Sequence, residues 1–218
     1  MGGRSKRAGF TLIEVMISGV ILAITLGGLG LAIHRGMELF RTSTANSEVE
    51  TKAGRSLHRI VEELRTAGST TITDLTTPAG APKFWSPVAD FRQALGWQDN
   101  AIVFGPDRRI ELELAPGEID NGIDDNGNGI VDDHVVVLLT NPGAIDEMRV
   151  VLATRVSELL AGELDNGVDD NGNGIADEGG LCFDQEGETI TVRLTVAGIS
   201  PSGDLIARTF EDAVVLKN

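Results

Sequence analysis

The stretch that decides the fold is FTLIEVMISGVILAITLGGLGLAI, residues 10–33. Its 24 residues contain no Lys, Arg or Asp. A helix needs about 20 apolar residues to cross the hydrocarbon core of a bilayer, so this stretch is long enough to span a membrane. The nine residues before it include Arg4, Lys6 and Arg7 and no acid. This basic flank predicts a cytoplasmic N-terminus and an exported remainder, either periplasmic or extracellular, on a single-pass protein of the cytoplasmic membrane.

A secretory signal peptide is the alternative interpretation of this N-terminus. Its apolar core is normally about 7–15 residues long, and a small-residue cleavage site follows that core. The apolar run in residues 10–33 is longer than this. Its length therefore favours a membrane-spanning helix.

One carboxylate, Glu14, lies inside the apolar run, four residues after Phe10. A charged group within hydrocarbon costs about 2.5–3.5 kcal/mol on insertion scales, so such a residue usually has a partner and a function. The alternative is that Glu14 sits at a shallow depth and extends toward the headgroups.

The segment RAGFTLIEVMIS, residues 7–18, resembles the prepilin signature of type IV pilins and type II secretion pseudopilins. The resemblance rests on the basic leader, on Gly9 and Phe10, and on Glu14. It implies that prepilin peptidase removes residues 1–9 by cutting after Gly9 and that Phe10 becomes N-methylated. It also implies that Glu14 pairs with the terminal amine of a neighbouring subunit during assembly. Opposite charges attract strongly in a medium of low dielectric constant, which agrees with that role.

Residues 34–68 are more polar than residues 10–33 but keep the residue spacing of a helix. Apolar residues recur there at spacings of three and four, which is typical of an amphipathic helix. They are Val49, Ala53, Leu57, Ile60, Val61, Leu64 and Ala67. A helix over residues 10–67 would be about 87 Å long at 1.5 Å per residue. Its second half is expected to dock its apolar stripe on the protein's own sheet.

Residues 69–218 are expected to form a β-rich exported head. Residues 70–99 are rich in Thr, Pro and Gly and indicate loop with short elements. Strands are predicted at residues 101–104, 109–114, 134–140, 148–153, 189–196 and 205–216, the first two joined as a hairpin by Gly105-Pro106-Asp107-Arg108. The predicted fold is α+β and pilin-like, with a long N-terminal helix, membrane-spanning in its first half, packed on an antiparallel sheet.

Acidic residues are concentrated in the head. The chain has a net charge of -15, and residues 111–188 hold 20 Asp or Glu against Arg149 and Arg155, a net of -18. Such a surface repels nucleic acid, so no nucleic-acid binding is predicted through it. The single cysteine, Cys182, cannot close an intramolecular disulfide, and it is expected to be a small buried residue. Bound metal could stabilise the head in place of a disulfide.

Two acidic loops repeat nearly the same sequence. GEIDNGIDDNGNGIVDD at residues 117–133 recurs as GELDNGVDDNGNGIADE at residues 162–178, with 13 of 17 positions identical at an offset of 45. Oxygen-bearing residues alternate before a glycine, as in the first half of an EF-hand calcium loop. The predicted ligands of two Ca²⁺ ions are Asp120, Asp124, Asn126, Asn128, the Ile130 carbonyl, Asp132 and Asp133 in the first loop, and Asp165, Asp169, Asn171, Asn173, the Ile175 carbonyl, Asp177 and Glu178 in the second.

The match to an EF-hand is incomplete at its twelfth position. Val135 and Gly180 stand where the bidentate glutamate would be, so Asp133, Glu178 or the upstream Asp120 and Asp165 must supply the remaining oxygens. The loops resemble thrombospondin type 3 or dockerin loops more than paired EF-hands. The alternative is a pair of flexible Asn-Gly and Asp-Gly turns without metal.

These features predict a structural pilin or pseudopilin subunit rather than an enzyme, with other such subunits, prepilin peptidase and the membrane as partners. The phrase EELRTAGS, the final strand pair and the terminal VVLKN resemble minor pilins and pseudopilins of the J or PilW type. A membrane-anchored, calcium-dependent adhesin or binding module is the alternative. An anchored hydrolase is disfavoured, because His34, His58 and His134 are isolated in the sequence and no nucleophile–base pattern accompanies them.

Overall fold

The structure is a computed structural model that describes residues 9–68 and 85–216. Helix α1 spans Leu12–Arg65, two residues short of the predicted start and end. The chain divides into two compact units, Met1–Ser43 and Thr44–Asn218, and α1 contributes residues to both. Of the predicted leader, only Gly9 lies among the described residues.

The second half of α1 buries the apolar stripe that the sequence predicts. Every residue of that stripe, from Val49 to Ala67, is buried. Together with Ile110, Val136, Phe183, Val192 and other strand residues, they form one hydrophobic core. The spacing of three and four residues places these side chains on one helix face, and burial of that face holds the helix against the sheet.

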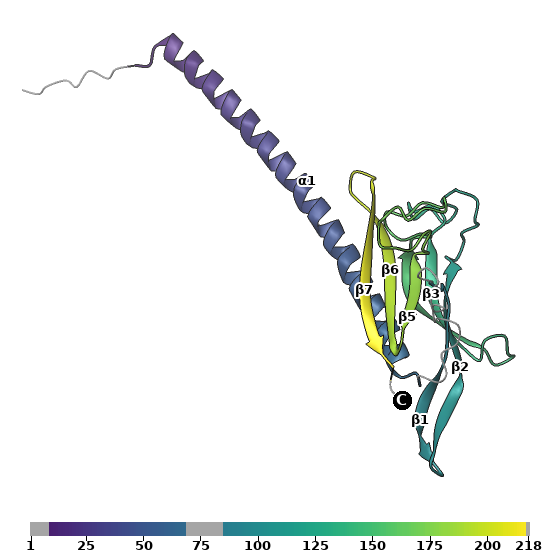
Figure 1. Cartoon of the computed structure of the whole chain (residues 1–218). Coiled ribbons are helices and arrows are strands. Elements are labelled where there is room, and N and C mark those ends of the chain that lie inside the picture. The colour runs from purple at the N-terminus through teal and green to yellow at the C-terminus, as the bar shows by residue number, and fades with distance from the viewer. Residues whose placement is uncertain (1–8, 69–84, 217–218) are drawn as a thin grey trace, which may run out of the picture. The chain divides into compact units, whose positions relative to one another are not determined.

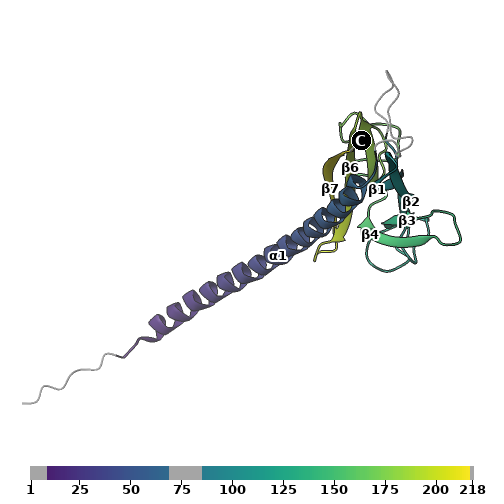
Figure 2. The same cartoon turned by 90° about the horizontal axis from the view of Figure 1, so that it is seen from below.

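The head is an antiparallel sheet of seven strands within the described residues (Figures 1 and 2). The strands are β1 (Ala89–Gln98), β2 (Ala101–Leu114), β3 (His134–Thr140), β4 (Met148–Val156), β5 (Leu181–Glu186), β6 (Thr189–Ile199) and β7 (Leu205–Val215). Their order is β1-β2-β3-β4-β6-β5, and β7 pairs with β6. The α+β class, with a long apolar helix before an antiparallel sheet, is therefore confirmed.

Most of the predicted strands are confirmed, with small shifts of their ends. β3 has the predicted bounds, β4 and β6 each extend three residues further, and β7 ends one residue earlier. The alternating residues Ile190, Val192, Leu194 and Val196 of β6 are all buried, as the pattern predicted. β5 was not predicted, because its apolar part is only Leu181, Cys182 and Phe183.

The predicted hairpin around Gly105-Pro106-Asp107-Arg108 is wrong. β2 is continuous through this tetrad, and its hairpin partner is β1, within the stretch expected to be loop. The turn is Asp99-Asn100, with φ of 50° and 63°, which suits a tight hairpin turn. Arg92 pairs with Asp107 and Ala94 with Phe104, so the register shifts beside Gly105 and Pro106. A bulge of this kind lets proline lie in a strand without donating a ladder hydrogen bond. Residues 70–84 of the expected loop lie outside the described residues.

The topology brings both acidic loops to the same end of the sheet. The first loop connects β2 to β3, and the second connects β4 to β5. His134, the first residue of β3, pairs with Val156, the last residue of β4. One loop therefore ends where the other begins, and both lie at one end of the strands (Figure 1).

Candidate functional site

The predicted processing site lies just before the first turn of α1. Phe10 is 86% exposed, and Gly9 is also exposed. Thr11 caps the helix: its hydroxyl accepts a hydrogen bond from the Glu14 amide at 3.3 Å, and Glu14 Oε2 accepts one from the Thr11 amide at 2.9 Å. This reciprocal pair is a capping box. Thr11 was not predicted as part of this site, although the pattern Thr-x-x-Glu is a signal for a capping box.

Glu14 therefore has a partner within the single chain. Its Oε2 also accepts a hydrogen bond from the Thr11 hydroxyl at 3.0 Å. A carboxylate has about four acceptor sites, so these contacts leave capacity for a further donor. The geometry is compatible with the predicted pairing to an amine of a neighbouring subunit.

The apolar half of α1 is exposed to a high degree along its length. Each Leu, Ile, Val and Met from Leu12 to Ile33 is more than half exposed. Among the described residues, α1 is the one helix long and apolar enough to cross a membrane. A helix that is apolar on all sides needs an apolar environment, which a bilayer or packed neighbouring helices can supply.

The two acidic loops have the same backbone conformation. Gly129 and its equivalent Gly174 have φ of 89° and 93°, and Asp132 and its equivalent Asp177 have φ of 46° and 52°. Each loop is closed at its base by one hydrogen bond. The amides of Ala115 and Leu160 donate to the carbonyls of Asp133 and Glu178, both at 2.9 Å. The sequence repeat is therefore also a structural repeat.

In the first loop, several predicted ligands converge on Asp133. The side-chain amides of Asn126 and Asn128 both donate to Asp133 Oδ1 at 3.0 Å. Asp124 curls the chain, because its two oxygens accept hydrogen bonds from the backbone amides of residues 127, 128 and 129. Ile130 is buried, as expected for a residue that would offer only its carbonyl.

The second loop repeats this arrangement around Glu178. Asn173 Nδ2 donates to Glu178 Oε1 at 2.7 Å, and Asp169 accepts from the backbone amides of residues 172, 173 and 174. Asn171 Oδ1 accepts from the Asn173 amide at 3.0 Å. Ile175 is buried.

Glu178 is an exceptional carboxylate within the head. It is fully buried, and its Oε2 has no hydrogen-bond partner among the described residues. Arg193 of β6 lies 3.9 Å from the other oxygen, Oε1, and also contacts Glu211 at 2.6 Å. Burial raises the pKa of the Glu178 carboxyl above its usual value, against the opposing effect of the Asn173 hydrogen bond. An orphaned buried oxygen beside a loop of oxygen donors suits a bound cation.

The structure explains why the twelfth EF-hand position lacks a carboxylate. Val135 is buried in β3 opposite Glu113 of β2, and Gly180 donates its amide to the Glu158 carbonyl at 2.7 Å. A Cβ at Gly180 would lie 1.7 Å from the Ser157 carbonyl oxygen. At this position the first loop has entered β3 and the second lies one residue before β5, and the last acidic side chains before it are Asp133 and Glu178.

The other predicted ligands take different positions. Asp132 and Asp177 accept backbone amides of residues 121–122 and 166–167, which closes the first turn of each loop. Asp120 and Asp165 are exposed and make no hydrogen bond to a described residue. Within residues 9–68 and 85–216, no three His, Cys, Asp or Glu side chains group as metal ligands. A cation here would therefore depend on asparagine and carbonyl oxygens as well as carboxylates.

Two buried glutamates organise the loops and were missed by the sequence analysis. Glu118 accepts the amide of Asn126 at 3.1 Å. Glu163 accepts the amides of Asn171 and Asp177 at 3.0 and 3.1 Å. The sequence does contain a signal for them, because each glutamate directly follows the first glycine of its copy of the repeat. Their hydrogen bonds are to backbone, which points to a role in shaping the loops.

Comparison with known proteins adds one finding. No curated protein and no solved structure matches the chain. A family model, the prokaryotic N-terminal methylation motif, matches residues 4–30. This range includes the Gly9–Phe10 junction, the capping box and most of the uncovered apolar stretch. The chain thus carries a prepilin-type methylation motif on an apolar helix, which supports a type IV pilin-like protein with a single-pass membrane anchor.

Proposed function

We propose that this protein is a structural subunit of a type IV pilus or a type II secretion pseudopilus. The observation that carries the proposal is the exposed Gly9–Phe10 junction, followed directly by the Thr11–Glu14 capping box on an uncovered apolar helix. The same helix can lie in a bilayer before assembly and pack against its neighbours afterwards. Prepilin peptidase would cut after Gly9 and methylate Phe10, and the head would face the periplasm or the exterior.

Within this role, Glu14 would guide assembly. In the single chain its carboxylate is held at the first turn of α1 by Thr11. Cleavage after Gly9 creates a free amine on Phe10 of each subunit, and Glu14 of a neighbour would accept it. The attraction is strong because hydrocarbon surrounds both groups, and it favours one register between helices. The sequence phrases shared with minor pilins support a minor rather than a major subunit.

We also propose that each acidic loop binds one Ca²⁺ ion that stabilises the head. In the first loop Asp124, Asn126, Asn128, the Ile130 carbonyl and Asp133 would hold it. In the second loop Asp169, Asn171, Asn173, the Ile175 carbonyl and Glu178 would hold it. Ca²⁺ accepts six to eight oxygen ligands with flexible geometry, which this mixed donor set suits better than it suits Mg²⁺. Each ion would offset two of the six negative charges in its loop.

The filament role is tested by substitution of Glu14. Glu14→Ala is expected to leave the head folded, yet to lower incorporation into sheared filaments by at least about tenfold, the effect of about 1.4 kcal/mol. Glu38→Ala is the matched control, because Glu38 is an exposed carboxylate on the same helix that contacts Arg35. Equal incorporation of the two variants would contradict the assembly role. It would favour the alternative, an anchored calcium-dependent binding module.

A further inference from the structure

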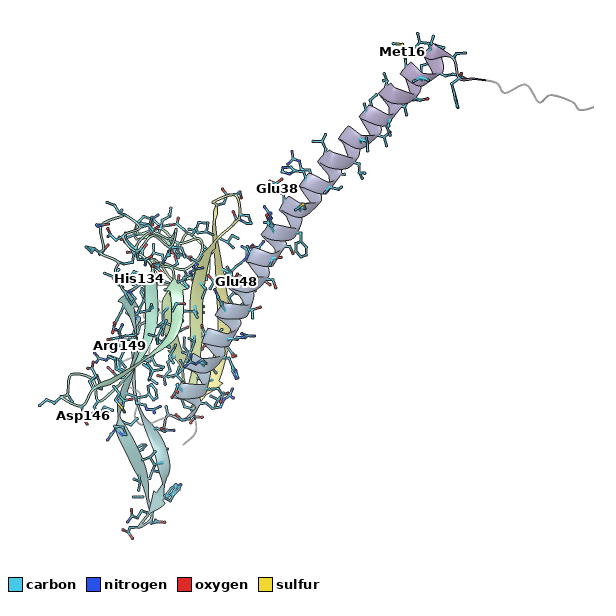
Figure 3. All side chains as sticks on the ribbon, turned by 180° about the vertical axis from the view of Figure 1, so that it is seen from behind. Met16, Glu38, Glu48, His134, Asp146 and Arg149 are labelled. Atoms are coloured by element: carbon cyan, nitrogen blue, oxygen red, sulfur yellow. The ribbon has the colours of Figure 1, made fainter. Side chains whose placement is uncertain are left out.

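The two acidic loops carry the same charge but differ in the cations around them. Both lie at the end of the sheet that His134 marks in Figure 3. Each holds six Asp or Glu and no Lys or Arg. Within residues 9–68 and 85–216, no Lys, Arg or His forms an ion pair with a carboxylate of the first loop, whereas Arg193 of β6 lies 3.9 Å from Glu178 Oε1 in the second. The second candidate calcium site therefore has a fixed positive charge that the first lacks.

Arg193 is held beside Glu178 by the two strands that pair with β6. In the register of the sheet it stands opposite Cys182 of β5 and Glu211 of β7. Its Nε donates to Glu211 Oε2 at 2.6 Å, and its Nη1 lies 3.9 Å from Cys182 Sγ. The Arg193 side chain is only 13% exposed, so water and salt screen its charge weakly.

The contact between Arg193 and Glu178 leaves one oxygen of Glu178 available. A distance of 3.9 Å is too long for a hydrogen bond, and it involves Oε1, which already accepts from Asn173 at 2.7 Å. The other oxygen, Oε2, has no hydrogen-bond partner among the described residues. Arg193 thus offsets part of the Glu178 charge without occupying the oxygen that a bound cation would use.

Asp133, the equivalent of Glu178 in the first loop, has neutral side-chain partners. Asn126 and Asn128 both donate to its Oδ1 at 3.0 Å. A cation that binds Asp133 would meet these amides without electrostatic repulsion. A cation that binds Glu178 would meet the guanidinium of Arg193 as well.

We propose that Arg193 lowers the calcium affinity of the second loop and leaves that of the first loop unchanged. Like charges repel strongly where water is excluded, so the guanidinium opposes a divalent ion at Glu178. Glu211 limits this effect, because it binds the Nε side of Arg193 and competes with Glu178 for the guanidinium. This inference rests on the proposed calcium binding and adds a residue that sets the affinity of one site.

Isothermal titration of the full chain in detergent with calcium tests Arg193 one loop at a time. Asp124→Ala leaves the second loop to titrate, and Asp169→Ala leaves the first. In the Asp124→Ala background, Arg193→Gln should lower the Kd for calcium at least about tenfold, equivalent to about 1.4 kcal/mol. In the Asp169→Ala background it should leave the Kd unchanged. Arg208→Gln, at an exposed cation of β7, is the matched control and should change neither Kd.

Two further variants separate the charge of Arg193 from its packing. Arg193→Lys keeps the positive charge and should not tighten the second loop as Arg193→Gln does. Glu211→Gln removes the competing carboxylate, so Arg193 should turn toward Glu178 and raise the Kd of the second loop. Because Glu211 is 57% exposed, this variant should fold, and it tests the proposal even if circular dichroism shows that Arg193→Gln does not.

Three results would overturn the role of Arg193. They are a second-loop Kd that does not fall in Arg193→Gln, an equal change in both loops, and tighter binding in Glu211→Gln or an equal gain in Arg193→Lys. If the loops bind calcium but the second-loop Kd is the same in every variant, this inference fails and the calcium proposal stands. If neither loop of the wild type or its variants binds calcium, the calcium proposal fails and this inference fails with it.

Discussion

Asn173 donates a hydrogen bond of 2.7 Å to one oxygen of Glu178, while the other oxygen of this fully buried carboxylate has no partner among the described residues. Asn128 and Asp133 make the equivalent contact in the first loop at 3.0 Å. In both loops, a predicted asparagine ligand donates a hydrogen bond to a predicted carboxylate ligand of the same cation. The Glu178 carboxylate is the more costly of the two to bury, because its unpaired oxygen is neither hydrogen-bonded nor solvated.

Substitution of Glu178 tests whether this carboxylate binds calcium. Glu178→Gln keeps the volume and removes the buried charge, so in chelator the protein should melt at an equal or higher temperature. In millimolar calcium it should lose about 2.7 kcal/mol of stabilisation, the value for one site at a hundredfold excess over Kd. Differential scanning fluorimetry of the full chain in detergent measures both, with Glu186→Gln on β5 as control. A wild-type calcium response in Glu178→Gln would exclude this ligand.

Removal of Asp124 and Asp169, the aspartates that begin the EF-hand-like ligand pattern of the two loops, tests calcium binding as a whole. Asp124→Ala combined with Asp169→Ala should abolish most of the increase in melting temperature between chelator and millimolar calcium. Calcium would raise the melting temperature of the wild type because two bound ions offset four negative charges within residues 111–188, whose net charge is -18. Without these two aspartates, the ions should no longer bind tightly. Identical melting curves for the wild type with calcium, with chelator and for the double variant would identify the loops as acidic turns without metal.

Glu163 is expected to stabilise the second loop whether or not metal is present. Glu163→Ala leaves the amides of Asn171 and Asp177 without their acceptor, so the free energy of unfolding should fall by about 2–3 kcal/mol in both chelator and calcium. Denaturant unfolding measures this, with the exposed Glu158→Ala as control. A loss seen only in calcium would instead make Glu163 a ligand.

The close approach at Gly180 gives a steric test of the sheet. Gly180→Ala would place a methyl group 1.7 Å from the Ser157 carbonyl oxygen, and the head should lose at least about 3 kcal/mol or fail to fold. Gly54→Ala is the matched control, because nothing lies within 4 Å of its added methyl group on α1. There alanine should stabilise the helix by about 1 kcal/mol. Circular dichroism melting curves of the two variants should therefore move in opposite directions.

Cys182 should be chemically inert in the folded protein. Desolvation raises the pKa of its thiol to about 12, despite the nearby Arg193. Iodoacetamide needs the thiolate, so labelling at pH 8 should require denaturant. Between about pH 9 and the folded-state pKa, the unfolded chain would release this proton and the folded chain would keep it, so stability should fall as pH rises. Rapid labelling of native protein, measured by mass spectrometry, would contradict this burial.

The sequence predicted features that a local pattern determines. The apolar stripe of α1 and the strand His134–Thr140 were predicted because periodicity and a continuous apolar run each favour one structure. The hairpin was placed wrongly because Gly105-Pro106 has the chemistry of a turn, whereas a bulge against β1 absorbs it within β2. The pairing of β2 with β1 keeps the strand continuous through these residues. A short stretch of sequence around Gly105 does not reveal that pairing.

The candidate site was predictable to a similar extent. The repeat predicted that Asp124, Asn128 and their equivalents would curl the chain, and their hydrogen bonds to backbone amides do so, while their role as ligands stays a prediction. The roles of Asp132 and Glu118 were not predictable, since both act on backbone amides about ten residues away that only the folded loop brings close. The unpaired oxygen of Glu178 was not predictable either, because the spacing of residues in the loop does not show that this side chain is buried.

The most direct test of the pilin-like assignment is the intact mass of the mature protein isolated from cells that contain prepilin peptidase. The mature protein should be one chain that begins at Phe10 and carries one additional methyl group on its terminal amine. Gly9→Leu should block this cleavage. A mature chain that begins near Ile33, or a wild-type chain that keeps residues 1–9 in the presence of active peptidase, would contradict the account.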